Sequence, residues 1–135
     1  MSAVLKELKV RKLAEAEEVD FGPFSSYHPL VADGDTPVRT GIQVCKPGYE
    51  AKMHWHPYVE VLFIIEGEMD AWQEDEDPVR LTAGDSIAIP IGMKHSFRTV
   101  GNKTMRLLGI HSNPDRVVNY LDGETREHGY PVLGE

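Results

Sequence analysis

Cysteine is almost missing from this chain, and long apolar runs and clusters of basic residues are missing altogether. Among the 135 residues Cys45 is the single cysteine, so no disulfide can form within the chain. The longest apolar run, Val61 to Ile65, is far too short to cross a bilayer. The net charge of -8 argues against nucleic acid as a partner, because a polyanion would be repelled. We therefore expect neither a nucleic acid nor a membrane to be the partner.

The N-terminal residues lack the features of an export signal. Met1 to Lys12 is mixed and charged, whereas a signal peptide has a continuous apolar stretch. A lone thiol without such a signal suits a reducing cytoplasm, which is where we expect the protein. Because Cys45 falls late in an apolar strand pattern, we expect a buried structural thiol rather than a reactive nucleophile.

The middle of the chain is typical of a β protein. Val38 to Cys45, Ser86 to Ile89 and Met105 to His111 each have strand composition and are bounded by turn residues. The continuously apolar Val61 to Ile65 is typical of a strand that is buried on both faces. Short strands at this spacing predict an all-β sandwich or barrel.

The segments that flank these strands have weaker patterns. Asn113 can cap a helix, and apolar residues follow at helical spacing, so we predict one short helix from Pro114 to Asp122. Nearer the N-terminus, Lys9 to Leu13 could be a strand and Ala14 to Val19 a short helix. The length fits one domain.

We expect that domain to have three parts. Residues 1–37 would be an N-terminal extension with one or more strands that pack on the barrel. Residues 38–111 would form the β-barrel core, and residues 112–135 the short helix and a C-terminal arm.

Three histidines and one glutamate have the spacing of a metal site. His54 and His56 are two residues apart, so on a strand their side chains point to the same face. Glu60 has the same parity, and His95, on a later strand, can complete the set. Such nitrogen and carboxylate ligands suit one divalent transition metal (Fe, Mn, Ni, Cu or Zn) better than Ca or Mg. The alternative, polar strand residues that face solvent, would be favoured for the two nearby histidines alone.

The two segments that carry these residues resemble the paired motifs of the cupin superfamily. From Gly48 the chain has five residues, His-x-His, three residues, glutamate, six residues and glycine. From Gly84 it has five residues, Pro-x-Gly, two residues and histidine; three residues later Thr99 stands where the family usually has asparagine. The resemblance covers roughly residues 38–111 and is to small single-domain cupins of the cupin-2 type, also called RmlC-like. It implies a double-stranded β-helix, or jelly-roll, barrel and a homodimer.

Five further residues are candidates for a pocket beside the metal. Leu62 and Phe97 could line the pocket or belong to the core beneath it. Gln43 could face inward and bind a ligand, or face solvent, and Thr99 could supply a hydroxyl in place of the missing amide. His111 ends the last strand, where a surface position is favoured over a role beside the metal ligands. The aromatic residues that could frame the pocket or a dimer contact are Tyr27, Tyr49, Tyr58 and Trp72.

Two classes of function fit these features. The first is a metal-dependent enzyme acting on a small molecule, either by dioxygenase-like oxidation of a chelating enol, catechol or diketone, or by isomerase or lyase chemistry on a Lewis-acid metal. In that class Glu60 would be a ligand and, when partly released, a catalytic base. The alternative is a non-catalytic module that binds a metal and a small ligand as a sensor, a carrier or a component of an assembly.

Overall fold

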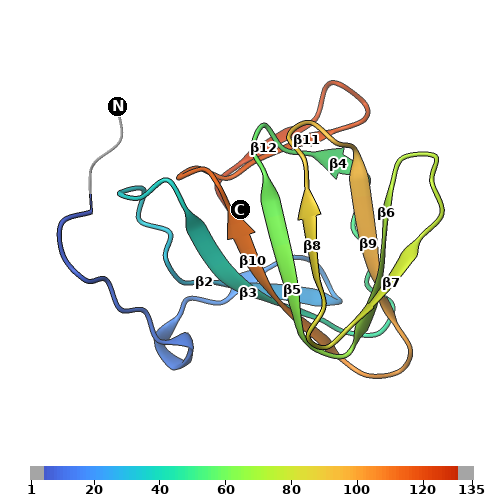
Figure 1. Ribbon diagram of the computed structural model, residues 1–135, viewed down its shortest axis with the longest axis horizontal. Coiled ribbons are helices and arrows are strands. Elements are labelled where there is room, and N and C mark those ends of the chain that lie inside the picture. The colour runs from blue at the N-terminus through green and yellow to red at the C-terminus, as the bar shows by residue number, and fades with distance from the viewer. Residues whose placement is uncertain (1–4, 131–135) are drawn as a thin grey trace.

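The structure is a computed structural model that describes residues 5–130, and two antiparallel six-stranded sheets make up almost all of it (Figure 1). Sheet A has the strand order β1 (Val19–Asp20), β2 (Ser25–Pro29), β3 (Arg39–Cys45), β10 (Met105–His111), β5 (Glu60–Glu66) and β8 (Ser86–Ile89). Sheet B has the order β12 (Arg126–His128), β11 (Val117–Tyr120), β4 (His54–Trp55), β9 (His95–Val100), β6 (Glu68–Gln73) and β7 (Val79–Thr82). The all-β class and the jelly-roll architecture predicted from the sequence are confirmed. Within the described residues, no helix is long and apolar enough to cross a membrane.

The core lies between the facing sides of the two sheets. Along β10 the buried and half-buried residues alternate strictly, which is the pattern of a strand with one face toward the interior. The side chains of Ile64, Met69 and Met105 are fully buried there, and Cys45 is buried beside them, as predicted. Burial raises the pKa of the Cys45 thiol to about 12, so the group is un-ionised at neutral pH.

Strand β5 is buried on one face only, which corrects the prediction that both faces are covered. Its inward residues Leu62 and Ile64 are almost inaccessible, but Phe63 and Ile65 on the outer face are 39% and 41% exposed. Because Phe63 and Ile65 are exposed on the outer face, an apolar run here does not indicate two buried faces.

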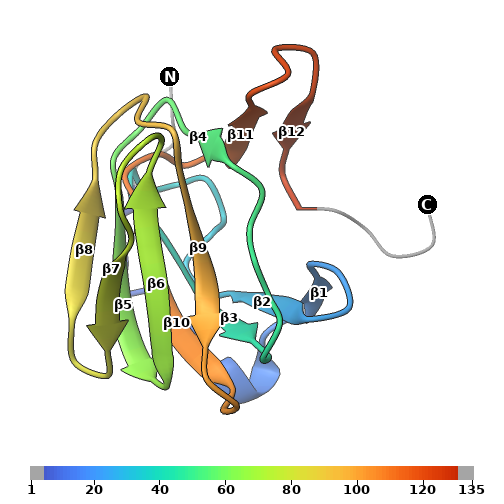
Figure 2. The same cartoon turned by 90° about the vertical axis from the view of Figure 1, so that its right-hand side faces the viewer.

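The helix predicted from Pro114 to Asp122 is wrong. Residues Val117–Tyr120 form β11, which pairs with β4 on one side and β12 on the other. Two β-branched valines open this strand, and the pairing satisfies its backbone groups on both edges. Figure 2 shows β11 and β12 on the side of the molecule away from β7 and β8. The far end of the predicted C-terminal arm, residues 131–135, lies outside the described part.

The N-terminal predictions fail in a similar way. Lys9 to Leu13 is not a strand, and the helix expected over residues 14–19 is reduced to one 3-10 turn, η1 (Leu13–Glu15). Lys9 forms ion pairs with Asp33 at 2.7 Å and with Asp35 at 2.5 Å, so this segment is held by side chains rather than by a β ladder. The same N-terminal part of the chain also supplies β1 and β2, and β2 pairs with β3 along its whole length.

Candidate metal centre

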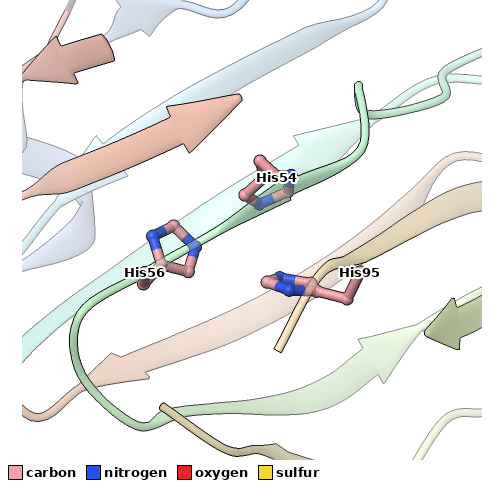
Figure 3. A group of neighbouring side chains, drawn as sticks. All are labelled: His54, His56 and His95. Atoms are coloured by element: carbon pink, nitrogen blue, oxygen red, sulfur yellow. The ribbon is translucent and has the colours of Figure 1, made fainter. Parts of the chain in front are cut away.

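Three histidines from sheet B and its connecting turn converge on one point (Figure 3). His54 opens β4 and His95 opens β9, and the two residues are direct partners in the antiparallel pairing of these strands. His56 follows β4 immediately. One ligand atom of each imidazole lies within 4.8 Å of the others, so a single ion between them could be bound by all three.

Each of the three rings is oriented by a backbone carbonyl at its Nδ1 atom. The distances are 2.6 Å from His54 to Lys52, 2.8 Å from His56 to Val117 and 2.8 Å from His95 to Met93. A carbonyl oxygen only accepts hydrogen bonds, so in the neutral rings Nδ1 carries the hydrogen and Nε2 keeps its lone pair. The Nε2 atoms of His56 and His95 are buried and make no hydrogen bond with any described residue. Buried lone pairs without a donor fit a metal ion.

Glu60 reaches the histidines from the opposite sheet. It opens β5 in sheet A, so the chain crosses between sheets after His56 and the strand parity used in the sequence argument does not apply. Its Oε1 atom lies 3.5 Å from His56 Nε2 and 3.3 Å from His95 Nε2. The structure thus brings the four expected ligand residues together, and their ligation of a metal stays a prediction.

His111 is part of the same cluster, which corrects the favoured surface position. It is buried, and its Nδ1 atom lies 3.4 Å from Glu60 Oε2. In sheet A, His111 of β10 is the register partner of Glu60 in β5 and of Arg39 in β3. A cation, an imidazole and a carboxylate therefore form one row across the inner face of three neighbouring strands.

The electrostatics of the cluster favour neutral imidazoles around an ionised carboxylate. Burial is the main cause that lowers the pKa of His111 to about 4, although Glu60 opposes the shift. Burial, together with the neighbouring His95 and His56, lowers the pKa of His54 to about 3. Burial alone would raise the pKa of Glu60, but the surrounding imidazoles outweigh it and hold that pKa well below its usual range.

A cavity of about 370 Å³ opens beside His54, His56, Glu60 and His111. Part of its wall consists of backbone without a side chain at Gly109 on β10, whose register partner on β3 is Gly41. A Cβ atom on Gly41 would lie 2.1 Å from the Tyr27 hydroxyl, and one on Gly109 would lie 3.1 Å from His111 Nε2. These glycines leave the space that the Tyr27 and His111 side chains occupy.

The predicted pocket residues divide between the cavity and the core. Gln43 faces inward, where its Nε2 atom donates to Ser25 Oγ at 3.0 Å and to Tyr49 Oη at 3.3 Å. Leu62 and Phe97 line the cavity and also belong to the core cluster. Thr99 does neither: its hydroxyl donates to the Cys45 carbonyl at 3.4 Å, away from the described lining. The three tyrosines Tyr27, Tyr49 and Tyr58 line the cavity, whereas Trp72 and His95 line a neighbouring cavity of about 450 Å³.

Arg39 is the residue that the sequence argument missed. It lines the cavity and is only 2% exposed. The inward parity of β3 is that of Arg39, Gly41 and Gln43. A charged residue with the parity of Gln43 was the signal that could have revealed it.

Comparison with known proteins identifies relatives of this chain. A family model described as a cupin domain matches residues 41–111. The polyketide synthase CurC of Streptomyces cyaneus is 33% identical over 85 residues, which cover 62% of this chain and 54% of that protein. The dimethylsulfoniopropionate lyase DddQ of Ruegeria pomeroyi is 35% identical over 75 residues, which cover 53% of this chain and 36% of that protein. The chain thus spans about half the length of CurC and less of DddQ.

Solved structures share the fold at low sequence identity. The polyketide cyclase RemF from Streptomyces resistomycificus has a TM-score of 0.69 at 18% identity, and the match covers 87% of this chain and 86% of RemF. The S161A mutant of Bacillus subtilis oxalate decarboxylase OxdC has a TM-score of 0.71 at 19% identity, and the match covers 82% of this chain and 31% of OxdC.

Proposed function

The chain belongs to the cupin family, and on that premise we propose that it is a metal-dependent enzyme acting on a small organic molecule. One observation carries the proposal: the Nδ1 atoms of all three clustered histidines are bound to carbonyls, and the Nε2 lone pairs of His56 and His95 are left beside Glu60. A purely structural cluster would have satisfied those buried nitrogens with donors from the protein. His54, His56, Glu60 and His95 would hold one Fe, Mn, Ni, Cu or Zn ion.

The protein's own residues would bind the substrate and move protons in the cavity. A bound divalent ion would polarise an oxygen of the substrate as a Lewis acid. His111 is neutral at pH 7 and faces Glu60, so its imidazole has one N–H to donate and one lone pair to accept, and it can relay a proton within the cavity. Gln43 and Tyr49 present a hydrogen-bonded pair on the wall that can orient polar groups of the substrate.

We favour isomerase or lyase chemistry over dioxygenase-like oxidation. DddQ, at 35% identity, is named a lyase, and CurC, at 33% identity, is named a polyketide synthase. Both names support reactions in which protons move and bonds are made or broken without oxygen. A neutral imidazole beside a carboxylate supports the same choice, because proton transfer needs groups within hydrogen-bond reach.

Elemental analysis of protein purified without a metal-binding tag is the test of this function. We expect close to one divalent transition metal per chain, and no oxygen uptake with chelating enols, catechols or diketones. Sustained oxygen uptake would move the assignment to the dioxygenase class. One metal ion per chain without turnover of any enol, catechol or diketone would favour the non-catalytic module that binds a metal and a small ligand. A site that stays empty after reconstitution with each of the five metals overturns the proposal.

A further inference from the structure

Among the residues that the structure describes, Arg39 is a buried cation without an anion. Its side chain lines the cavity at 2% exposure, and no carboxylate of residues 5–130 lies within ion-pair distance of it. A buried guanidinium that lacks a counter-ion is costly, so such groups are normally paired or bind a ligand. The other arginine on this cavity, Arg116, does have a carboxylate partner in Glu127 at 3.3 Å.

The groups around Arg39 are neutral and leave donors in excess. Its guanidinium donates to Tyr130 Oη at 2.9 Å, to Tyr58 Oη at 3.0 Å and to the Asn113 carbonyl at 3.4 Å. A guanidinium has five N–H groups, so these three bonds leave donors available. Each phenol oxygen accepts from Arg39 and keeps its own O–H to donate. Burial raises the pKa of Tyr58, so this phenol is neutral at pH 7.

Tyr27 adds a hydroxyl that has no acceptor. Tyr27 is 4% exposed and lines the cavity, and its Oη atom makes no hydrogen bond with any described residue. The ring is stacked between Phe21 and Tyr130, with centroids 5.2 Å away on each side, so the hydroxyl is held in place over Gly41. A buried donor without a partner among residues 5–130 is available to an acceptor on a bound ligand.

We propose that Arg39, with the hydroxyls of Tyr27, Tyr58 and Tyr130, binds a carboxylate of the substrate. A planar guanidinium fork matches a carboxylate in geometry and charge, and the phenols supply further donors. The stacked aromatic walls suit an apolar or planar body next to the carboxylate. This inference rests on the proposed function only where it places the rest of that substrate beside the histidines.

The register of sheet A defines the substrate class further. Arg39 and Glu60 are separated by one intervening strand, and neighbouring strands are about 4.8 Å apart, so their backbones are roughly 10 Å apart. The proposal places the carboxylate at Arg39 and a second oxygen of the same substrate at the metal. The substrate class is an organic acid whose carboxylate is several bonds away from an enol, phenol or carbonyl oxygen.

A purely structural role is the alternative that the experiment must exclude. Arg39 also ties β3 to Tyr130 and Asn113 of the C-terminal segment, so its removal would lower stability in either case. A structural role does not give selectivity for an anion over a neutral molecule of the same shape. The experiment therefore measures the preference for an anion over a neutral molecule of the same shape, and not the stability of the variant.

The test uses full-length protein kept metal-free with a chelator, so that a probe cannot bind through the metal. Binding of benzoate and phenylacetate is compared with that of benzamide and phenylacetamide by calorimetry or ligand-observed NMR. We expect the carboxylates to bind at least about 10-fold more tightly than the amides, the range of a hydrogen bond to a charged group. Arg39→Gln should abolish the preference, and Tyr27→Phe should reduce it about 3- to 10-fold. The matched control is Arg106→Gln, which removes the same charge from the outer face of β10 and should change nothing.

Either of two results overturns the proposal that Arg39 binds a carboxylate: no carboxylate preference in the wild type, or an unchanged preference in Arg39→Gln. If Arg39→Gln does not fold, Arg39→Lys and Tyr27→Phe decide, because the lysine keeps the charge without the fork and the phenylalanine keeps the ring stack. Metal content of the same protein, measured after purification and before any chelator is added, separates the two proposals. A carboxylate preference in protein that takes up no metal would support carboxylate binding at Arg39 and contradict the proposed function. Full metal content without a carboxylate preference would support the proposed function and contradict carboxylate binding at Arg39.

Discussion

Glu60 and His111 face each other across neighbouring strands of sheet A, with 3.4 Å between Glu60 Oε2 and His111 Nδ1. The other carboxylate oxygen faces His56 and His95 at 3.5 and 3.3 Å. Glu60 therefore joins the histidine cluster of sheet B to the polar row of sheet A. An ion that bound to Glu60 would be coupled to His111 through one carboxylate, which is the arrangement in which a proton and a metal can act on one substrate.

The histidine cluster gives the first prediction. His54→Ala or His95→Ala should lose most of the bound metal, because each removes one of three imidazole ligands. The fold should survive, since the core depends on apolar residues such as Ile64 and Met105. Metal per chain and circular dichroism are the measurements. His128→Ala is the control, because His128 is exposed on β12, and full metal occupancy in either ligand variant would show that the site is misassigned.

Glu60→Gln keeps the shape of the side chain and removes its charge. We expect metal affinity to fall by roughly 10- to 100-fold, the range measured when groups around metal sites are changed. Activity at saturating metal should fall as well, because the neutral amide no longer presents a negative charge to His111 and to the ion. A competition titration with a chromophoric chelator measures the affinity. An unchanged affinity would mean that Glu60 orients histidines without touching the ion.

Acidification should destabilise the metal-free protein between about pH 6.5 and pH 4. The pKa of His111 is lowered from 6.5 to about 4 in the fold, so over this interval the unfolded chain binds the proton that the folded chain rejects. Stability is therefore fully present above pH 6.5 and declines as the pH falls through this window. At about 1.4 kcal/mol per pKa unit, the contribution of His111 alone to this decline is on the order of 3 kcal/mol, and His54, whose pKa is lowered to about 3, adds a loss of the same sign.

His111→Gln isolates this contribution. The variant should show a flatter dependence of the free energy of unfolding on pH over the same window, whatever its stability at pH 7. Denaturant titrations at several pH values measure the slope, and His128→Gln is the control on the exposed face. Equal slopes for wild type and His111→Gln would contradict the shifted pKa.

Local sequence patterns predicted the strands and the set of residues that converge, but not how they converge. The Gly48 and Gly84 segments carry fixed spacings, and the turn before His95 and its strand follow from local residue chemistry. Glu60 was assigned by strand parity, yet it comes from the opposite sheet, because the chain crosses over after His56. Parity along one strand contains no information about such a crossing.

The remaining misses share a cause in long-range pairing. The valines of β11 have a spacing that also fits a helix, and the ladders with β4 and β12 decide between the two. His111 ends its strand, where exposure is common, but pairing with Arg39 and Glu60 places it in the interior. Neither set of partners is adjacent in the sequence, so propensity and periodicity could not identify them.

Gly41→Ala tests whether the position of the Tyr27 ring, which lines the cavity, depends on the missing side chain at residue 41. A Cβ atom there would lie 2.1 Å from Tyr27 Oη and 2.3 Å from Tyr27 Cζ, so the ring must move out of its stack. We expect a loss of about 1–3 kcal/mol in the free energy of unfolding, as for other overpacked sites. Gly109→Ala should cost less, since its nearest neighbour is His111 Nε2 at 3.1 Å. Thermal and denaturant unfolding measure both.

The double variant Tyr27→Ala, Gly41→Ala shows whether the clash with Tyr27 causes the loss of stability in Gly41→Ala. If the clash with Tyr27 is the origin of the loss, Gly41→Ala should cost little once the ring is absent, and the two changes will be strongly non-additive. If Gly41→Ala destabilises both backgrounds equally, the glycine is needed for its backbone and not for the Tyr27 ring. In that case the hydroxyl is not held over Gly41, and Tyr27 would lose the fixed position from which it faces the cavity.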